Sequence, residues 1–222
     1  MQDDSAAKEQ TAPAAGQGLW ETWPLGKGLR VRARRFVLES LRPEQVTDEI
    51  HGWFFQPEFR RSFPTFNVPE SREKFAQLYG NWKAKTMRTV LIRTETETVG
   101  FLWVAPNRTG ELVQTHNFVG NKAWRGLGVV HEARGFLMHA LFRMGVSRIW
   151  GMPRVDNVRA IRCYEDQGFV REGQLRLHYP HPDGGRADAV AFGMLPGEFD
   201  LQRATALPER ARRKIEAARA GG

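Results

Sequence analysis

Residues 124–141 read WRGLGVVHEARGFLMHAL and hold two glycines, Gly126 and Gly128, at the start of a predicted helix. Apolar residues then recur every three or four positions from Val130 to Met144, which predicts an amphipathic helix. The first N–H groups of a helix have no partner within it and carry the positive end of its dipole. Glycine lets the backbone approach a ligand closely because it has no Cβ. The stretch therefore predicts an anion site suited to a pyrophosphate.

Two common phosphate-binding motifs do not fit this loop. A P-loop needs GxxxxGK[ST], and the loop lacks both the lysine and the hydroxyl residue. A dinucleotide fingerprint needs GxGxxG in an opening βαβ unit, whereas Gly128 is followed by Val-Val-His and the loop comes late in the chain. ATP-type and NAD-type sites are therefore excluded at this loop.

The hydrophobic pattern predicts a single mixed α/β (α+β) domain over residues 19–199. Residues 1–18 are predicted to be disordered, and 200–222 to form a basic, helical, solvated tail. Because a helix connects the strand before the loop to the strand after it, these two strands are expected to be parallel. The elements predicted within the domain are a strand over 29–41, helices over 43–55 and 70–85, three strands between 88 and 120, a helix over 129–144, a strand over 147–154, a helix over 157–167 and a hairpin over 169–196.

Composition narrows the class of protein. The net charge of +8 predicts a surface that attracts polyanions. No run of eighteen apolar residues predicts a membrane span, and the polar N-terminus does not resemble a secretory signal. The single cysteine, Cys163, excludes an internal disulfide, so a reducing compartment, the cytoplasm, is predicted.

A second motif lies further along the chain. Residues 156–169, DNVRAIRCYEDQGF, match N-x-x-A-x-x-x-Y-E-x-x-G-F. With the RGLG loop upstream, this motif resembles the GCN5-related N-acetyltransferase (GNAT) superfamily, and most closely its ribosomal-protein and small-molecule N-acetyltransferase branch. The resemblance covers residues 30–196. It implies a mixed, splayed sheet of about seven strands flanked by about four helices.

The resemblance also implies acetyl-CoA, or another acyl-CoA, bound between two strands. Val130 stands where the family prefers Gly or Ala, and its β-branched side chain adds bulk where phosphate oxygens would approach. Asn157 matches a cofactor-contacting asparagine of the family and equally suits a helix N-cap. The implied cofactor-binding residues are Phe118, Val119, Gly120, Arg125, Gly126, Leu127, Gly128, Val129, Val130 and Asn157.

Three residues are candidates for the proton transfers. Tyr164 matches the tyrosine that protonates the departing thiolate in many members, although it could simply pack on the sheet. His116, on the strand before the loop, is the first candidate base because its usual pKa suits proton transfer at neutral pH; a half-buried structural role stays open. Glu111 is the second candidate base. Cys163 beside Tyr164 is interpreted as a small buried helix residue rather than an acyl carrier. No metal site is predicted.

The implied function is transfer of an acyl group to an amine by direct attack on the thioester. The acceptor is an amine-bearing small molecule, peptide or protein, and no membrane partner is expected. Two alternatives stay open: a degenerate protein that binds acyl-CoA or acts by interaction without turnover, and an acyltransferase acting on a nucleic-acid or RNA-associated acceptor. A basic surface alone gives only non-specific affinity for nucleic acid. Either a monomer or a homodimer is compatible with the sequence.

Overall fold

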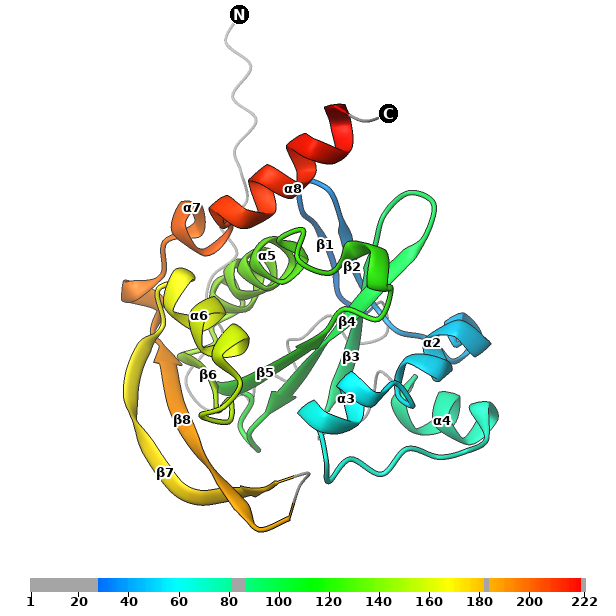
Figure 1. Ribbon diagram of the computed structural model, residues 1–222, viewed down its shortest axis with the longest axis horizontal. Helices are drawn as coiled ribbons and strands as arrows, with labels where there is room; N and C mark the ends of the chain where they lie inside the picture. The colour runs from blue at the N-terminus through cyan, green and yellow to red at the C-terminus, as the bar shows by residue number, and fades with distance from the viewer. Residues whose placement is uncertain (1–27, 81–86, 182–183, 221–222) are drawn as a thin grey trace, which may run out of the picture.

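The computed structural model describes residues 28–80, 87–181 and 184–220, and the tail predicted over 1–18 lies outside them. One sheet is flanked by helices on both faces (Figure 1). Its strands are β1 (Arg30–Arg32), β2 (Val37–Ser40), β3 (Arg88–Arg93), β4 (Thr98–Pro106), β5 (Leu112–Phe118), β6 (Arg148–Gly151), β7 (Val170–Pro180) and β8 (Arg186–Met194). The helices are α2 (Asp48–Trp53), α3 (Pro57–Ser62), α4 (Arg72–Tyr79), α5 (Val129–Arg143), α6 (Val158–Asp166), α7 (Leu201–Ala204) and α8 (Glu209–Ala220), with short 3-10 turns at Pro43–Gln45, Lys122–Trp124 and Pro196–Glu198.

The sheet is splayed at its centre. Its strand order is β1-β2-β3-β4-β5-β6-β8-β7, and β5–β6 is its parallel pair, while the other neighbouring strands run antiparallel. Helix α5 connects β5 to β6, which confirms the predicted parallel crossover. The two strands pair only from Leu112↔Arg148 to Gln114↔Trp150, after which β5 continues to Phe118 paired with β4 but not with β6. The backbone of β5 beyond Gln114 is thus left with an open edge facing β6.

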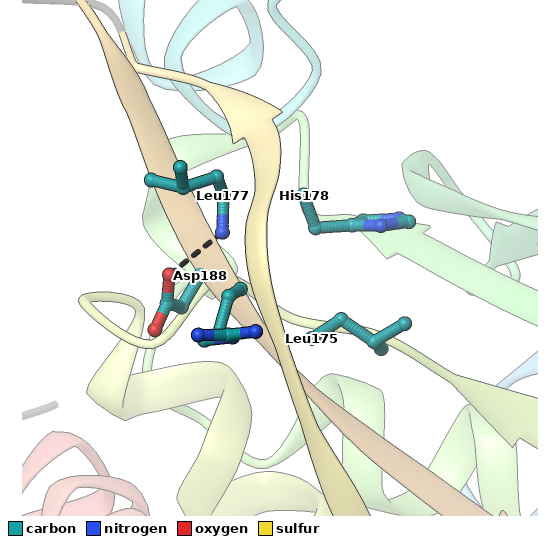
Figure 2. Close-up of a pocket in the computed structure, with 5 residues that line it drawn as sticks. Leu175, Leu177, His178 and Asp188 are labelled. Carbon is teal, nitrogen blue, oxygen red and sulfur yellow. Dashed lines mark hydrogen bonds between the residues drawn. The ribbon is translucent and has the colours of Figure 1, made fainter.

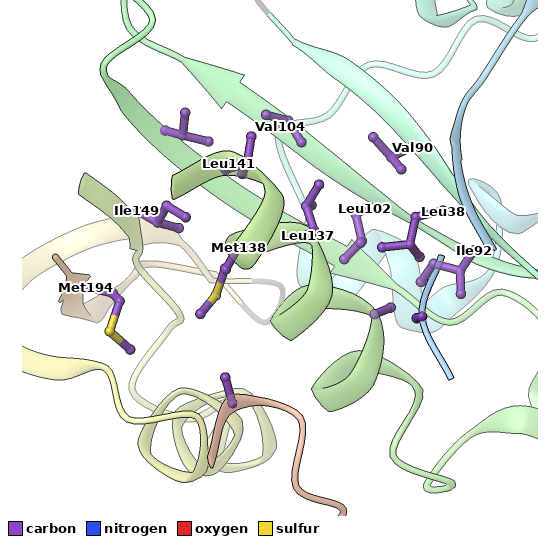
Figure 3. Close-up of a cluster of buried hydrophobic side chains, with 14 of the residues drawn as sticks. Leu38, Val90, Ile92, Leu102, Val104, Leu137, Met138, Leu141, Ile149 and Met194 are labelled. Carbon is purple, nitrogen blue, oxygen red and sulfur yellow. The ribbon is translucent and has the colours of Figure 1, made fainter. Parts of the chain in front are cut away.

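Each face of the sheet buries its own core. On one face, α5 packs Leu137, Met138 and Leu141 against aliphatic residues of β2 to β6 (Figure 3). On the other face, aromatic side chains of α2 to α4 pack against β4 and β5, with Phe54 and Phe101 stacked at 4.8 Å between ring centroids. The aromatic run over 53–66 is therefore mainly core: Trp53, Phe54 and Phe59 are buried, and Phe63 and Phe66 pack against them.

The first predicted strand, 29–41, is two strands. The chain reverses between β1 and β2, where the Ala33 N–H donates to the Phe36 carbonyl at 2.8 Å. Glu132 of α5 holds the turn, because its carboxylate accepts from the Arg35 backbone N–H at 2.5 Å and from the Arg35 guanidinium at 2.7 Å. The described sheet consequently has eight strands rather than about seven.

The C-terminal segment, predicted as a solvated tail, is helical and packs on the domain. Helix α7 lies against α5, and Ala204 and Thr205 are fully buried. Gln167, at the end of α6, donates to the Ala204 carbonyl at 2.8 Å and so ties this segment to the sheet-flanking helices. Ala211 of α8 is also buried. Within the described ranges, none of the helices has the length and apolar character that crossing a membrane requires.

Candidate active site

Tyr164 lies in the opening of the splayed sheet. It is only 5% exposed, and its hydroxyl donates to the Thr115 carbonyl at 3.3 Å, one residue past the last β5–β6 pair. Its ring stacks on Phe192 of β8 with 5.1 Å between centroids. On the other side, the guanidinium of Arg134, a residue of α5, lies 4.1 Å from the centroid of the Tyr164 ring. Burial raises the pKa of the Tyr164 hydroxyl, so it holds its proton at neutral pH.

A glycine makes room for this tyrosine. A Cβ atom on Gly151, the last residue of β6, would collide with the Tyr164 hydroxyl. A glycine inside a strand often marks such a close approach. Thr115 adds a second feature, because it is fully buried and its hydroxyl oxygen has no hydrogen-bond partner among the residues that the structure describes. Neither residue was predicted as part of the site; the available signal was a glycine within the strand predicted over 147–154.

The glycine loop forms the mouth of α5 as predicted. Gly126 and Gly128 adopt left-handed backbone conformations, with φ of 81° and 72°, which favour glycine. The first intrahelical bond runs from the Glu132 N–H to the Gly128 carbonyl at 3.2 Å. The N–H groups of Val129 and Val130 therefore precede the helical hydrogen-bond ladder and are available to an anion. Val129 packs its side chain into the core, whereas Val130 is half-buried.

Arg125 uses its side chain to brace this loop. Its Nε donates to the Val119 carbonyl at 3.0 Å, and its other nitrogens bind the Glu58 carboxylate at 2.9 Å and the Gln56 side chain. Leu127 is half-buried, and its N–H donates to the Trp124 carbonyl at 3.3 Å. Arg125 was expected among the cofactor-binding residues, and its guanidinium is already engaged by α3 and the end of β5.

The end of β5 is anchored on the aromatic face. Phe118 is buried in the aromatic core, 5.3 Å from Phe59 between centroids. Gln56 donates to the Gly120 carbonyl at 3.1 Å, and Gly120 itself lies against the Trp53 indole, where no Cβ would fit. Side chains here serve packing, so a ligand in the splay would meet β5 through its backbone.

His116 projects toward the α2–α4 side of the sheet. Its ring lies 5.9 Å from Phe63 and 6.3 Å from Trp103 between centroids. Burial lowers the pKa of His116 to about 4, so the imidazole is neutral at physiological pH. His116 is next to Thr115, the residue that binds Tyr164, so both predicted proton-transfer residues lie at the splay.

Glu111, the second candidate base, does not lie at the splay with Tyr164 and His116. Glu111 precedes the paired end of β5, where its carbonyl accepts from the Ser147 N–H at 2.9 Å and its carboxylate from Thr109 at 3.0 Å. Asn157 caps α6, accepting from the Ala160 N–H at 3.2 Å, which is the N-cap role left open by the sequence. Glu111 is therefore a turn residue at the end of β5 remote from Phe118.

Cys163 belongs to a buried polar cluster behind the site. Its sulfur lies 3.8 Å from His131 Nδ1 and accepts from Arg134 at 3.4 Å, while His131 Nε2 lies 3.1 Å from the Asp166 carboxylate. Burial raises the pKa of the Cys163 thiol and so disfavours the thiolate. The cluster joins α5 to α6 and fixes Tyr164, the neighbour of Cys163, in position.

The hairpin β7–β8 borders the opposite side of the site and carries a hollow of about 700 Å³ (Figure 2). Leu177 interrupts β7 with φ of 51°, unusual for a leucine, and its N–H donates to Asp188 at 2.8 Å. Two residues further on, Tyr179 is half-buried, and its pKa is raised first by burial and then by the nearby Tyr164 phenol. The hairpin therefore brings Tyr179 close to the splay.

These features have counterparts in known proteins. A family model described as an acetyltransferase (GNAT) domain matches residues 42–177, more than half of the chain. The chain belongs to the GNAT acetyltransferase family. In this GNAT protein the glycine loop and the motif that holds Tyr164 of α6 are the features from which the resemblance was inferred, and the splay between β5 and β6 is what the resemblance implied.

Individual relatives agree with this assignment. The GNAT chain is 28% identical over 78 residues to a [ribosomal protein bS18]-alanine N-acetyltransferase of Haemophilus ducreyi, a match spanning 35% of this chain and 54% of that relative, about half its length. An acetyltransferase (GNAT family) from Bacillus anthracis shares the fold, with a TM-score of 0.65 and 20% identity over 77% of this chain and all of that one. Spermidine N-acetyltransferase from Vibrio cholerae, solved with CoA and spermine, also shares the fold. Its TM-score is 0.65 and its identity 17%, over 74% of this chain and 97% of that one.

Proposed function

We propose that this GNAT protein transfers an acyl group from an acyl-CoA to an amine by direct attack. The observation that carries the proposal is the Tyr164 hydroxyl in the opening between β5 and β6, next to a glycine loop at a helix mouth. An amine acceptor is also what the relatives are named for: alanine of a ribosomal protein in one and spermidine in another. The acceptor of this chain is proposed only as an amine on a small molecule, peptide or protein.

The described residues fit a CoA-type cofactor in two ways. The loop from Gly126 to Val130 offers backbone N–H groups at the positive end of α5, suited to the pyrophosphate. The open edge of β5 from Thr115 to Phe118 offers backbone groups of the kind that pantetheine amides pair with. Acyl-CoA supplies the thioester, whose carbonyl carbon the amine attacks. In this assignment Asn157 serves α6 first, as its N-cap, and contacts the cofactor only beside that role.

Tyr164 is proposed as the proton donor to the departing thiolate. Its raised pKa keeps the phenol protonated, and Gly151 leaves it room in the splay. Its present acceptor, the Thr115 carbonyl at 3.3 Å, is a long and therefore weak contact that a better acceptor can replace. General acid catalysis by a positioned side chain typically contributes about 10²–10⁴-fold to rate.

His116 is proposed to receive the proton of the amine, directly or through water. A pKa of about 4 makes His116 a weak base at neutral pH. Its neutral ring still accepts a hydrogen bond from an ammonium or amine on the α2–α4 side. Glu111 is not proposed as the base, because it lies at the end of β5 that pairs with β6, away from the splay.

The proposed location remains the cytoplasm, where one buried cysteine stays reduced.

Calorimetry with acetyl-CoA and with CoA tests the cofactor assignment directly. We expect one binding site per chain, and slow release of free thiol when acetyl-CoA is incubated with candidate amines. The amine panel comprises a polyamine, an amino sugar and peptides with free N-terminal alanine. Absence of binding by folded protein would contradict the proposal. Binding of acetyl-CoA without turnover on any amine would instead favour the alternative hypothesis of a degenerate protein that binds acyl-CoA but does not catalyse transfer.

A further inference from the structure

The C-terminal helix α8 lies across the glycine loop (Figure 1). The Leu207 side chain, just before α8, occupies the space where a Cβ on Gly128 would stand, and the Ala211 Cβ lies 3.5 Å from the same point. Ala211 is 1% exposed, so this contact is a packed interface. The family match ends at residue 177, and α8 therefore lies beyond the region this chain shares with the family model.

This packing brings a lysine to the loop. The Lys214 ammonium nitrogen lies 3.2 Å from the position that a Cβ would take on Gly126, and both residues are exposed to solvent. Arg210 lies one turn earlier in α8. Burial is the main cause that lowers the pKa of His131 in the first turn of α5, and the charges of Arg134 and Arg210 add to it. Two cations of α8 thus stand near the start of α5.

The charge balance there is unusual for a helix start. Acidic side chains normally stabilise the positive end of a helix, whereas cations are unfavourable there. The acidic residue in the first turn, Glu132, is occupied by Arg35. Within the described residues, Lys214 makes no hydrogen bond or ion pair, while Arg213 on the outer side of α8 pairs with Glu209. The Asp166 carboxylate lies beside His131 on the α6 side of this turn. At Gly126, the positive end of the α5 dipole and the Lys214 ammonium meet on exposed loop backbone.

We propose that Lys214 binds the pyrophosphate of the acyl-CoA, which makes α8 part of the cofactor site. This inference rests on the proposed function and extends it to a segment outside the family match. Apolar contacts from Leu207 and Ala211 anchor the helix, and Lys214 reaches the edge of the loop. A phosphate on the loop amides would then receive a charge-assisted hydrogen bond from the ammonium.

Calorimetry on three variants of the full chain tests the inference. Lys214→Gln should weaken binding of CoA about tenfold to a hundredfold, the usual effect of losing a hydrogen bond to a charged group. Lys214→Arg should restore most of the affinity because it keeps the charge. Arg212→Gln is the matched control, since Arg212 is exposed on the same helix without adjoining the loop glycines, and its affinity should change less than about twofold. Melting temperatures would show that all variants are folded.

A second ligand locates the contact. 3′-Dephospho-CoA keeps the pyrophosphate, so Lys214→Gln should weaken it by the same factor as CoA. A loss confined to CoA would overturn the assignment to the pyrophosphate. Equal affinities of Lys214→Gln and Arg212→Gln would overturn the inference while leaving the proposed function intact, and tighter binding by Lys214→Gln would show that α8 obstructs the site. Failure of the parent protein to bind CoA would contradict the proposed function itself.

Discussion

The Tyr164 hydroxyl occupies the space in which residue 151 would carry its Cβ, and Gly151 leaves that space open. This relationship joins the end of β6 to the last turn of α6 and decides where the phenol stands in the splay. The tyrosine is otherwise held by stacking on Phe192 and by the Arg134 guanidinium over its ring. Position 151 is consequently a sensitive probe of the proposed acid.

Gly151→Ala should displace Tyr164 from the splay. We expect turnover to fall at least about tenfold and the free energy of unfolding to fall by about 1–3 kcal/mol, the usual cost of overpacking. Urea denaturation and thiol release from acetyl-CoA measure the two effects. Gly173→Ala in β7 is the control, because a Cβ there meets no atom within 4 Å. Equal behaviour of the two variants would show that Gly151 has no special role.

Tyr164→Phe should lower kcat by about 10²–10⁴-fold and leave acetyl-CoA affinity nearly unchanged. The ring and its stacking are retained, and only the proton and the long bond to Thr115 are lost. Tyr179→Phe removes a second nearby hydroxyl and serves as the comparison. A fall of less than about threefold in Tyr164→Phe, with chemistry limiting turnover, would rule out the acid role.

His116 should make the protein lose stability in acid. Its pKa is lowered from 6.5 unfolded to about 4 folded, so the stabilising contribution is complete above the unfolded value and is lost as the pH falls toward 4. Between pH 7 and 4.5 this amounts to about 2–3 kcal/mol. Urea denaturation at both pH values should show a smaller loss for His116→Gln than for the parent. The pKa of His131 is also lowered, but His131 is present in both proteins, so equal losses would contradict the assignment.

Val130→Ala should leave the fold intact and bind CoA at least as well as the parent protein. Val130 is half-buried in the first turn of α5, and alanine is the better helix former. Removing two methyl groups opens the approach to the loop amides. Calorimetry with CoA and a melting curve check this together. Clearly weaker binding would mean that the valine is fitted to the ligand.

The surroundings of His116, and therefore its pKa, could not be predicted from the sequence of its own strand. His116 and Phe118 lie two positions apart on β5 and so share a face, but the pKa of His116 depends on how closely Phe63 and Trp103 enclose it. Those rings come from α3 and β4, far apart in sequence. The pKa of about 4 is a property of that enclosure. The usual histidine pKa, on which the choice of base rested, therefore does not apply in the folded protein.

The local pattern of the chain was enough to determine the β3–β5 meander, helix α5 with its glycine start, the parallel crossover and the position of Tyr164 on α6. These follow from periodicity and turn chemistry, which act over a few residues. Tertiary contacts decided what local pattern cannot encode. The bond from Arg35 to Glu132 holds the turn that divides one predicted strand into β1 and β2. Gly151 leaves room for the Tyr164 hydroxyl, and Leu207 and Ala211 pack α8 against the glycine loop. Each of these joins residues distant in sequence, and only the packed fold brings them within contact.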